Sequence, residues 1–145
     1  MSAEAGLQFV DTNILVYAYD RSAGERHLRA SNLVTELWQS GSGCLSIQVL
    51  QEFYVVVTRK LSPISFADLR VVLSDLTLWR VHAPVAADVL AAADLHQRYQ
   101  VSFWHAMILR SAVHLGCTTV WSEDLNPGQA YQGVQIKNPF AATMK

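Results

Sequence analysis

The feature of this sequence that most constrains its fold is the alternation of short apolar runs with longer stretches of helical periodicity. Runs long enough only for strands are followed by segments in which apolar residues recur every three or four positions. Strands that alternate with helices favour a parallel sheet covered by helices on both faces. We therefore expect an α/β fold, a three-layer α/β/α sandwich with a short, mostly parallel central sheet.

The expected elements follow one another along the whole chain. Strands are expected at residues 7–10, 44–47, 78–82 and 118–121, with a candidate fifth strand at 134–136. Helices are expected at residues 14–19 (a short helix or turn), 23–40, 51–60, 65–76, 84–99 and 102–115. Gly41 and Gly116 are typical helix ends, Pro84 is a typical helix start, and Ser65 and Ser102 are typical caps. In the helix at 23–40 the spacing predicts one buried stripe, formed by Leu28, Leu33, Val34 and Leu37.

Composition agrees with one domain over residues 1–145. Hydrophobic residues make up 51% of the chain and charged residues 16%, which favours a sizeable core over disorder. Cys44 and Cys117 have no metal-finger spacing, so we expect two reduced thiols in the core of a cytoplasmic protein. The N-terminus lacks a signal-peptide pattern, and no apolar run is long enough to span a membrane. The net charge of −1 excludes a generally basic nucleic-acid coat, so any nucleic acid must be held by a local patch or through a metal.

Three acids fall where the strands of such a sheet end. Asp11 follows the first strand, Asp124 follows the fourth, and Glu52 lies near the start of the helix after the second strand. In an open parallel sheet these positions meet at the carboxyl edge, where ligands bind. Taken singly, each acid is a common helix cap, turn residue or solvated side chain. Taken together, clustered carboxylates require a cation, and oxygen ligands suit Mg²⁺ or Mn²⁺.

The residues around these acids resemble the motifs of the PIN domain family, in particular the VapC toxins of toxin–antitoxin pairs. The similar segments occur in the family's order and span nearly the whole chain: Phe9–Leu15, Gln51–Phe53, Ser102–Leu109, Ser122–Leu125 and the closing residues 128–140. The Asp-Thr-Asn string in the first segment is weak evidence alone. The four motifs in order are specific, with Ser122–Leu125 and residues 128–140 together forming the closing motif.

The resemblance implies a compact α/β/α domain and a metal-dependent ribonuclease that acts on structured RNA such as tRNA. Carried over by motif, Asp11 is the first metal ligand, Glu52 the second acid and Asp124 the fourth. The resemblance also implies that a second set of side chains orients these acids: Thr12, Asn13 and Ser122. Glu123 is expected to be a solvent-exposed turn acid without a role.

The same resemblance implies partners. It predicts a cognate VapB-like antitoxin that lays a helix or tail into a groove near the acids, and a homodimer. For RNA phosphates, Arg21 and Arg26 are the best candidates because they follow closely on Asp11, although ordinary surface charge is the preferred explanation for either one alone. Trp104 is expected to pack in the core, with stacking on unpaired bases as the alternative.

The sequence departs from the family pattern at one central position. His105 stands where the third motif carries an aspartate that ligates metal. Imidazole suits Zn²⁺, Cu, Fe or Ni better than Mg²⁺, and Mn²⁺ tolerates it. His105 is therefore a ligand for a softer ion, a proton donor or phosphate contact, a structural residue, or the mark of an impaired site.

Two functions follow as alternatives. The first is an active ribonuclease toxin with Asp11, Glu52, His105 and Asp124 as catalytic residues and Mg²⁺ or Mn²⁺ as cofactor. The second is a catalytically impaired PIN domain that acts by binding antitoxin or RNA. Other α/β classes lack their residues here: a receiver needs paired acids and a late lysine, a haloacid-dehalogenase-type phosphatase needs an acid at Asn13, and a dinucleotide site needs a glycine fingerprint.

Overall fold

The protein folds around a six-stranded sheet, as a computed structural model describes it for residues 6–60 and 64–141. The strand order is β3-β2-β1-β4-β6-β5, and all neighbours pair in parallel except β5, which is antiparallel to β6. The strands are β1 (Gln8–Val10), β2 (Gly43–Ser46), β3 (Arg80–His82), β4 (Thr119–Trp121), β5 (Ala130–Tyr131) and β6 (Val134–Lys137). The expected mostly parallel α/β sheet is thus confirmed.

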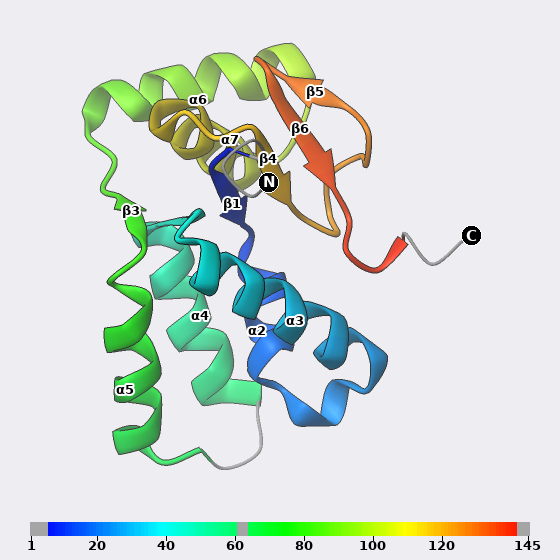
Figure 1. Ribbon diagram of the computed structural model, residues 1–145. Coiled ribbons are helices and arrows are strands. Elements are labelled where there is room, and N and C mark those ends of the chain that lie inside the picture. Colours follow the sequence, from blue (N-terminus) through cyan, green and yellow to red (C-terminus); the bar gives the residue numbers. More distant parts are fainter. Residues whose placement is uncertain (1–5, 61–63, 142–145) are drawn as a thin grey trace.

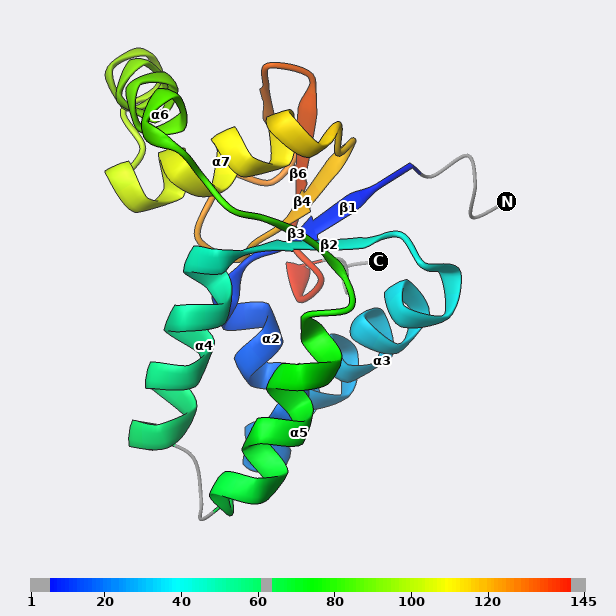
Figure 2. The ribbon, with the colours of Figure 1, turned by 90° about the vertical axis from the view of Figure 1, so that its left-hand side faces the viewer.

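Helices cover both faces of this sheet. The α-helices are α2 (Thr12–Tyr19), α3 (Glu25–Ser40), α4 (Ile47–Lys60), α5 (Phe66–Leu76), α6 (Ala86–Tyr99) and α7 (Phe103–Leu115), with a short 3₁₀ turn, η1 (Arg21–Ala23). In Figure 1 the strands lie between α6 and α7 on one side and α2 to α5 on the other. Figure 2 shows the same layers with the sheet nearly edge-on.

Local sequence signals set the helix ends. Asp11, Ser65 and Ser102 each adopt extended backbone angles, and each accepts a hydrogen bond from a backbone N–H of the first turn. Gly41 and Gly116 end α3 and α7 in the left-handed conformation, at φ 70° and 79°. These caps were expected from the sequence, and they put Asp11 and His105 at helix starts that face the same edge of the sheet.

Several expected boundaries and burials were wrong. Ile47 begins α4 rather than ending β2, and α4 begins four residues earlier than predicted. Leu28 is 57% exposed, because it lies five, six and nine positions before Leu33, Val34 and Leu37, which puts it on the opposite face of α3. Trp104 is 62% exposed instead of packing in the core. The two-residue β5 was missed because it is too short to have a period.

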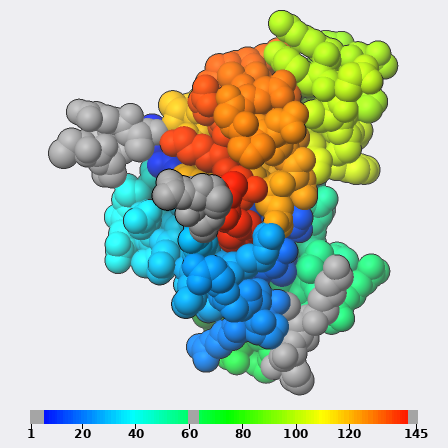
Figure 3. Space-filling view, turned by 90° about the vertical axis from the view of Figure 1, so that its right-hand side faces the viewer, coloured from blue at the N-terminus to red at the C-terminus, as the bar shows by residue number. Residues whose placement is uncertain are grey.

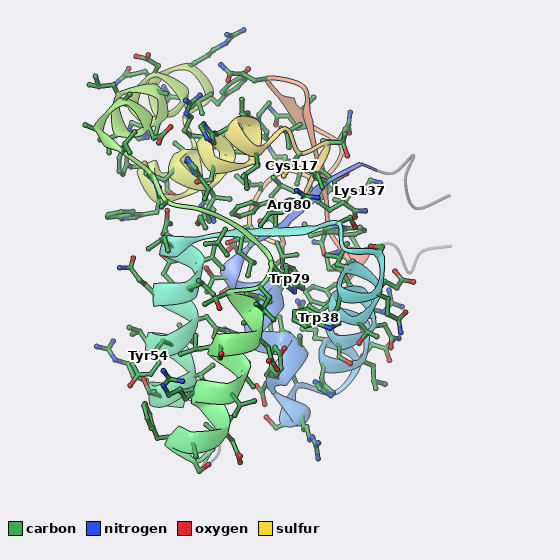
Figure 4. All side chains as sticks on the ribbon, turned by 60° about the vertical axis from the view of Figure 1, so that its left-hand side comes forward. Trp38, Tyr54, Trp79, Arg80, Cys117 and Lys137 are labelled. Carbon is green, nitrogen blue, oxygen red and sulfur yellow. The ribbon has the colours of Figure 1, made fainter. Side chains whose placement is uncertain are left out.

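One close contact, between the start of β2 and the residue before β3, requires glycine. Trp79 precedes β3 and packs on Gly43 at the start of β2, where an added Cβ would overlap the indole ring. Trp38 of α3 approaches the same ring, with centroids 6.0 Å apart (Figure 4). Gly43 therefore lets α3 and the β3 edge close over the sheet.

The segment after β6 packs on the first helices. Phe140 lies edge-on to Tyr17 with centroids 5.3 Å apart, and Arg29 Nη1 donates to the carbonyl of Pro139. In Figure 3 these last described residues, in red, lie next to the blue residues of the first helices. These contacts tie the segment after β6 to α2, which follows Asp11, and to α3.

Two further expectations concern the cysteines and membrane-spanning segments. Cys44 and Cys117 are buried free thiols, as predicted. Among the described residues, no helix has the length and apolar character needed to cross a membrane. Apart from Gly6, the N-terminal residues used in the signal-peptide argument lie outside the described part of the chain.

Candidate active site

Asp11 is the buried centre of the candidate site. It follows β1 directly, caps α2, and its side chain is only 5% exposed. Its Oδ1 accepts a hydrogen bond from the backbone N–H of Thr12 at 2.7 Å, and its Oδ2 accepts one from Ser122 Oγ at 2.9 Å. Both donors are neutral, so they do not balance the negative charge of this buried carboxylate. An unbalanced buried negative charge favours the binding of a cation.

The loop after β4 brings Asp124 to the same edge. Ser122 is fully buried, and its hydroxyl both donates to Asp11 and accepts the backbone N–H of Asp124 at 3.1 Å. Asn13 Nδ2 donates to Asp124 Oδ2 at 2.9 Å. Ser122 and Asn13 therefore link the two carboxylates through hydrogen bonds, and the family resemblance implies an orienting role for both.

Glu52 approaches from α4. Its Oε1 accepts a hydrogen bond from Thr12 Oγ1 at 2.7 Å, and Gln48 Nε2 lies 3.4 Å from its Oε2. Gln48 also donates to the carbonyl of Trp104, which joins α4 to the start of α7. Gln48 was not singled out from the sequence. Its position one helical turn before Glu52 was the only signal available.

His105 lies between the two aspartates. Its Nε2 is 3.5 Å from Asp11 Oδ2 and 3.6 Å from Asp124 Oδ2. Its Nδ1 is 2.9 Å from Ser102 Oγ, which also accepts the backbone N–H of His105 at 3.1 Å. The helix cap thus turns one ring nitrogen away from the acids and aims the other at them.

The neighbouring carboxylates alter the titration of this imidazole. The hydrogen-bonding contact with Asp11 raises the pKa of His105 above its ordinary value, partly opposed by burial. The negative charges of Asp11, Asp124 and Glu52 raise the pKa further. When protonated, His105 therefore offsets part of the repulsion among these acids.

These residues line one cavity of about 510 Å³. Asp11, Glu52, His105 and Asp124 form its polar wall. Its apolar wall is formed by Val55, Val56, Trp104 and Ile108. A cavity of this size with convergent polar groups on one side is the usual form of a ligand site.

The donor set fits a metal ion. One ligand atom each from Asp11, His105 and Asp124 lies within 4.8 Å of the other two. Among the described residues, the ion pairs of Asp11 and Asp124 involve His105 alone, so the acids are not already neutralised by lysine or arginine. The structure thus brings together all four acidic or histidine positions that the sequence analysis selected, with Thr12, Asn13 and Ser122 beside them.

The two candidate phosphate-binding arginines differ in their surroundings. Arg26 forms an ion pair with Glu123 and lies over the rings of Tyr17 and Phe140. The expectation that Glu123 is a solvent-exposed turn acid was therefore wrong. Its side chain is 21% exposed and forms an ion pair with Arg26. Arg21 is exposed in the 3₁₀ turn η1.

The chain belongs to the PIN domain family, because the family's model matches residues 9–131. The match contains the segments of Asp11, Glu52, His105 and Asp124.

Solved structures with the same fold include toxins and toxin–antitoxin complexes. One is the crystal structure of Mycobacterium tuberculosis VapC20, a toxin that cleaves the sarcin-ricin loop, with 22% identity, a TM-score of 0.60, and coverage of 81% of this chain and 89% of that one. Another is FitAB bound to a DNA fragment, with 17% identity, a TM-score of 0.67, and coverage of 92% and 95%. A third is DNA-bound VapBC from Salmonella typhimurium, with 16% identity, a TM-score of 0.65, and coverage of 92% and 98%. Curated proteins gave no significant match.

Proposed function

We propose that this protein is a VapC-type endoribonuclease toxin that hydrolyses phosphodiester bonds of structured RNA, such as tRNA, with the help of a divalent cation. The observation that carries the proposal is the convergence of Asp11, His105 and Asp124 at one sheet edge, with ligand atoms within 4.8 Å of one another. Membership of the PIN family and a fold similar to that of an RNA-cleaving toxin support it.

In this proposal Asp11, Asp124 and His105 hold the cation, and Glu52 serves as the further acid. When bound, Mg²⁺ or Mn²⁺ supplies Lewis-acid activation of water and neutralises charge on the phosphate. Asp11 is held in position by Ser122 and the N–H of Thr12, and Asp124 by Asn13. Such outer partners fix ligand orientation and affect metal affinity 10- to 100-fold in general.

Thr12 gives Glu52 its position. The Thr12 hydroxyl donates to Glu52 Oε1 and leaves Oε2 beside the Gln48 amide. Glu52 thereby faces the cavity with one weakly engaged oxygen, which suits it to accept a proton from an attacking water or to bind a second cation. Arg21, exposed beyond α2, is the candidate for a phosphate contact.

A second candidate function follows from His105. A PIN domain in which imidazole replaces a carboxylate ligand has one negative charge fewer, and the imidazole, when protonated, offsets part of the charge of Asp11 and Asp124. Such a domain would act by binding an antitoxin or RNA rather than by cleaving it. Its retained cavity and acids are compatible with either function.

The proposed partners are a cognate VapB-like antitoxin and a second copy of this chain, in the cytoplasm. Antitoxin complexes among the proteins of the same fold, VapBC and FitAB, support the first. The apolar wall of the cavity, formed by Val55, Val56 and Trp104, offers a surface beside the acids for an antitoxin tail.

The test is cleavage of a total tRNA and ribosomal RNA pool in Mg²⁺ or Mn²⁺. The variants are Asp11→Asn and His105→Asp, and Asp94→Asn is the matched control because Asp94 is an exposed acid on α6 outside the cavity. We expect cleavage by the natural chain and by Asp94→Asn, and its loss in Asp11→Asn. The fragments should carry 5′-phosphate and 3′-hydroxyl ends, as the family resemblance implies.

The outcomes separate the two functions. Cleavage that survives Asp11→Asn contradicts the assignment of the site. Cleavage only by His105→Asp identifies a domain disabled at its third ligand and favours the binding function. Inactivity of every variant, His105→Asp included, contradicts the nuclease proposal for these substrates.

A further inference from the structure

We propose that His105 Nε2 is a metal ligand of the candidate site and raises its affinity for first-row transition ions, such as Mn²⁺, Co²⁺ or Zn²⁺, relative to its affinity for Mg²⁺. The inference rests on the proposed function, since it concerns the cation of the same site. It names the class of that cation.

The distances fit an ion with nitrogen and oxygen ligands. Two ligands bonded at about 2.1 Å to one tetrahedral ion lie about 3.4 Å apart. His105 Nε2 is 3.5 Å from Asp11 Oδ2 and 3.6 Å from Asp124 Oδ2. These separations would let His105 and either aspartate hold one ion together.

The orientation of the ring fits as well. Metal-binding histidines usually use one nitrogen for the metal and give the other to a hydrogen-bond partner. His105 Nδ1 lies 2.9 Å from Ser102 Oγ, and a serine hydroxyl has two lone pairs, one for this ring N–H and one for the backbone N–H of His105. With Nδ1–H donated to Ser102, the lone pair of Nε2 faces the two carboxylates.

The donor set disfavours Mg²⁺. Mg²⁺ requires near-ideal octahedral oxygen ligation and keeps several waters, whereas imidazole suits Mn²⁺, Co²⁺ and Zn²⁺. The site keeps the carboxylates of Asp11, Glu52 and Asp124, so it still attracts a divalent ion. His105 changes the affinity of the site for transition ions relative to its affinity for Mg²⁺.

The experiment measures metal binding without RNA. The metal-free protein is titrated with Mg²⁺, Mn²⁺, Co²⁺ and Zn²⁺ by calorimetry, and Co²⁺ binding is also followed by its visible absorption. Because nearly every nitrogen- or oxygen-containing site binds Zn²⁺ more tightly than Mg²⁺, the informative quantity is the change in the Mn²⁺/Mg²⁺ and Zn²⁺/Mg²⁺ affinity ratios between variants.

The variants are His105→Asp, His105→Gln and, as control, His114→Gln. His114 belongs to a second His/Asp group with His82 and Asp88, so its variant reports any binding there. We expect His105→Asp to lower both ratios by about tenfold or more. We expect His105→Gln to lose the Co²⁺ absorption of nitrogen ligation, and His114→Gln to leave the ratios unchanged. Circular dichroism checks that each variant is folded.

The inference is overturned if both ratios are the same in the natural chain and His105→Asp, or if the natural chain binds none of the transition ions. Failure of the nuclease proposal looks different. In that case the ratios shift as expected, yet neither the natural chain nor His105→Asp cleaves RNA in any of the four metals.

Discussion

Two groups of histidine and aspartate lie in this domain, and they differ in how their carboxylates are neutralised. The first is Asp11, His105 and Asp124, at the cavity. The second is His82, Asp88 and His114, which joins β3, α6 and α7. Both bring ligand atoms within 4.8 Å of one another, so spacing alone does not tell them apart.

In the second group the protein supplies the positive charge itself. Arg110 Nε donates to Asp88 Oδ1 at 2.8 Å, and the backbone N–H of Val85 donates to Oδ2 at 2.8 Å. These two donors lower the pKa of Asp88, with the N–H of Val85 the larger cause. His82 Nδ1 lies 2.8 Å from Ser111 Oγ, and its ring stacks on His114. This group has little need of a cation.

The pKa values of buried His82 and partly buried His105 move in opposite directions. Burial and the neighbouring His114 lower the pKa of His82, whereas the carboxylates raise the pKa of His105. The comparison teaches that surplus negative charge, rather than the presence of histidine and aspartate, distinguishes a site that can bind a cation. We therefore interpret the second group as structural.

The largest expected effect comes from Asp124→Asn. We expect RNA cleavage to fall by more than about 100-fold, since even outer partners of a metal ligand affect function 10- to 100-fold. We also expect Tm to stay within about 2 °C or to rise, because a carboxylate that repels Asp11 and Glu52 is removed. Cleavage assays and differential scanning calorimetry on one preparation measure both. A marked fall in Tm without loss of cleavage would reverse the roles assigned to the two groups.

We expect the corresponding substitution in the second group, Asp88→Asn, to affect stability rather than the cavity. The amide leaves Arg110 without its charged partner and presents a donor where His82 and Arg110 lie. We expect Tm to fall by roughly 5 °C and metal binding at the cavity to be unchanged. If Asp88→Asn leaves Tm unchanged, the network through Arg110 is not what holds α6 to α7.

The sequence predicted the candidate site well because its residues follow strand ends. Asp11, Glu52 and Asp124 were expected to meet since carboxyl ends of parallel strands share an edge, and the structure brings them together with His105. The family motifs selected His105 as the unusual position. The helix caps at Ser65 and Ser102 also depend only on the local sequence, and both predictions were confirmed.

The expectations that failed depend on contacts between distant segments. The Arg26–Glu123 pair joins α3 to the loop after β4, and nothing in either local pattern indicates it. Trp104 lies in the first turn of α7 at the wall of the cavity, and helical periodicity does not specify that this wall stays open. The second His/Asp group was missed for the same reason, since β3, α6 and α7 meet only in three dimensions.

A smaller effect should appear in the pH dependence of stability. Burial lowers the pKa of His82 in the folded protein, so the unfolded chain takes up the proton first, near pH 6.5. The stability contributed by neutral His82 is therefore fully present above about pH 6.5 and is lost as the pH falls through the lower folded value. The groups that face His82 are Asp88 of α6 and Arg110, Ser111 and His114 of α7.

The measurement is Tm of the metal-free protein between pH 8 and pH 5, compared with His82→Gln. We expect the natural chain to lose a few degrees more than the variant, about 2–4 °C, below pH 6.5. The comparison is needed because His105, whose pKa is raised, has the opposite dependence: it stabilises below its ordinary pKa and loses that effect as the pH rises. Parallel curves for the two proteins would show that His82 does not titrate with unfolding.

The smallest effect is expected at the Arg26–Glu123 pair, which resembles Arg110–Asp88 in chemistry but not in burial. Its side chains are 45% and 21% exposed, against 28% and 3% for Arg110 and Asp88. Exposed ion pairs typically contribute a few tenths of a kcal/mol, so Arg26→Gln should lower Tm by about 1–2 °C. Since Glu123 already neutralises Arg26, RNA affinity should fall less than in Arg21→Gln, whose guanidinium is exposed in η1. Filter binding at two salt concentrations compares the variants. A larger loss of affinity in Arg26→Gln would mean that RNA displaces Glu123 from Arg26.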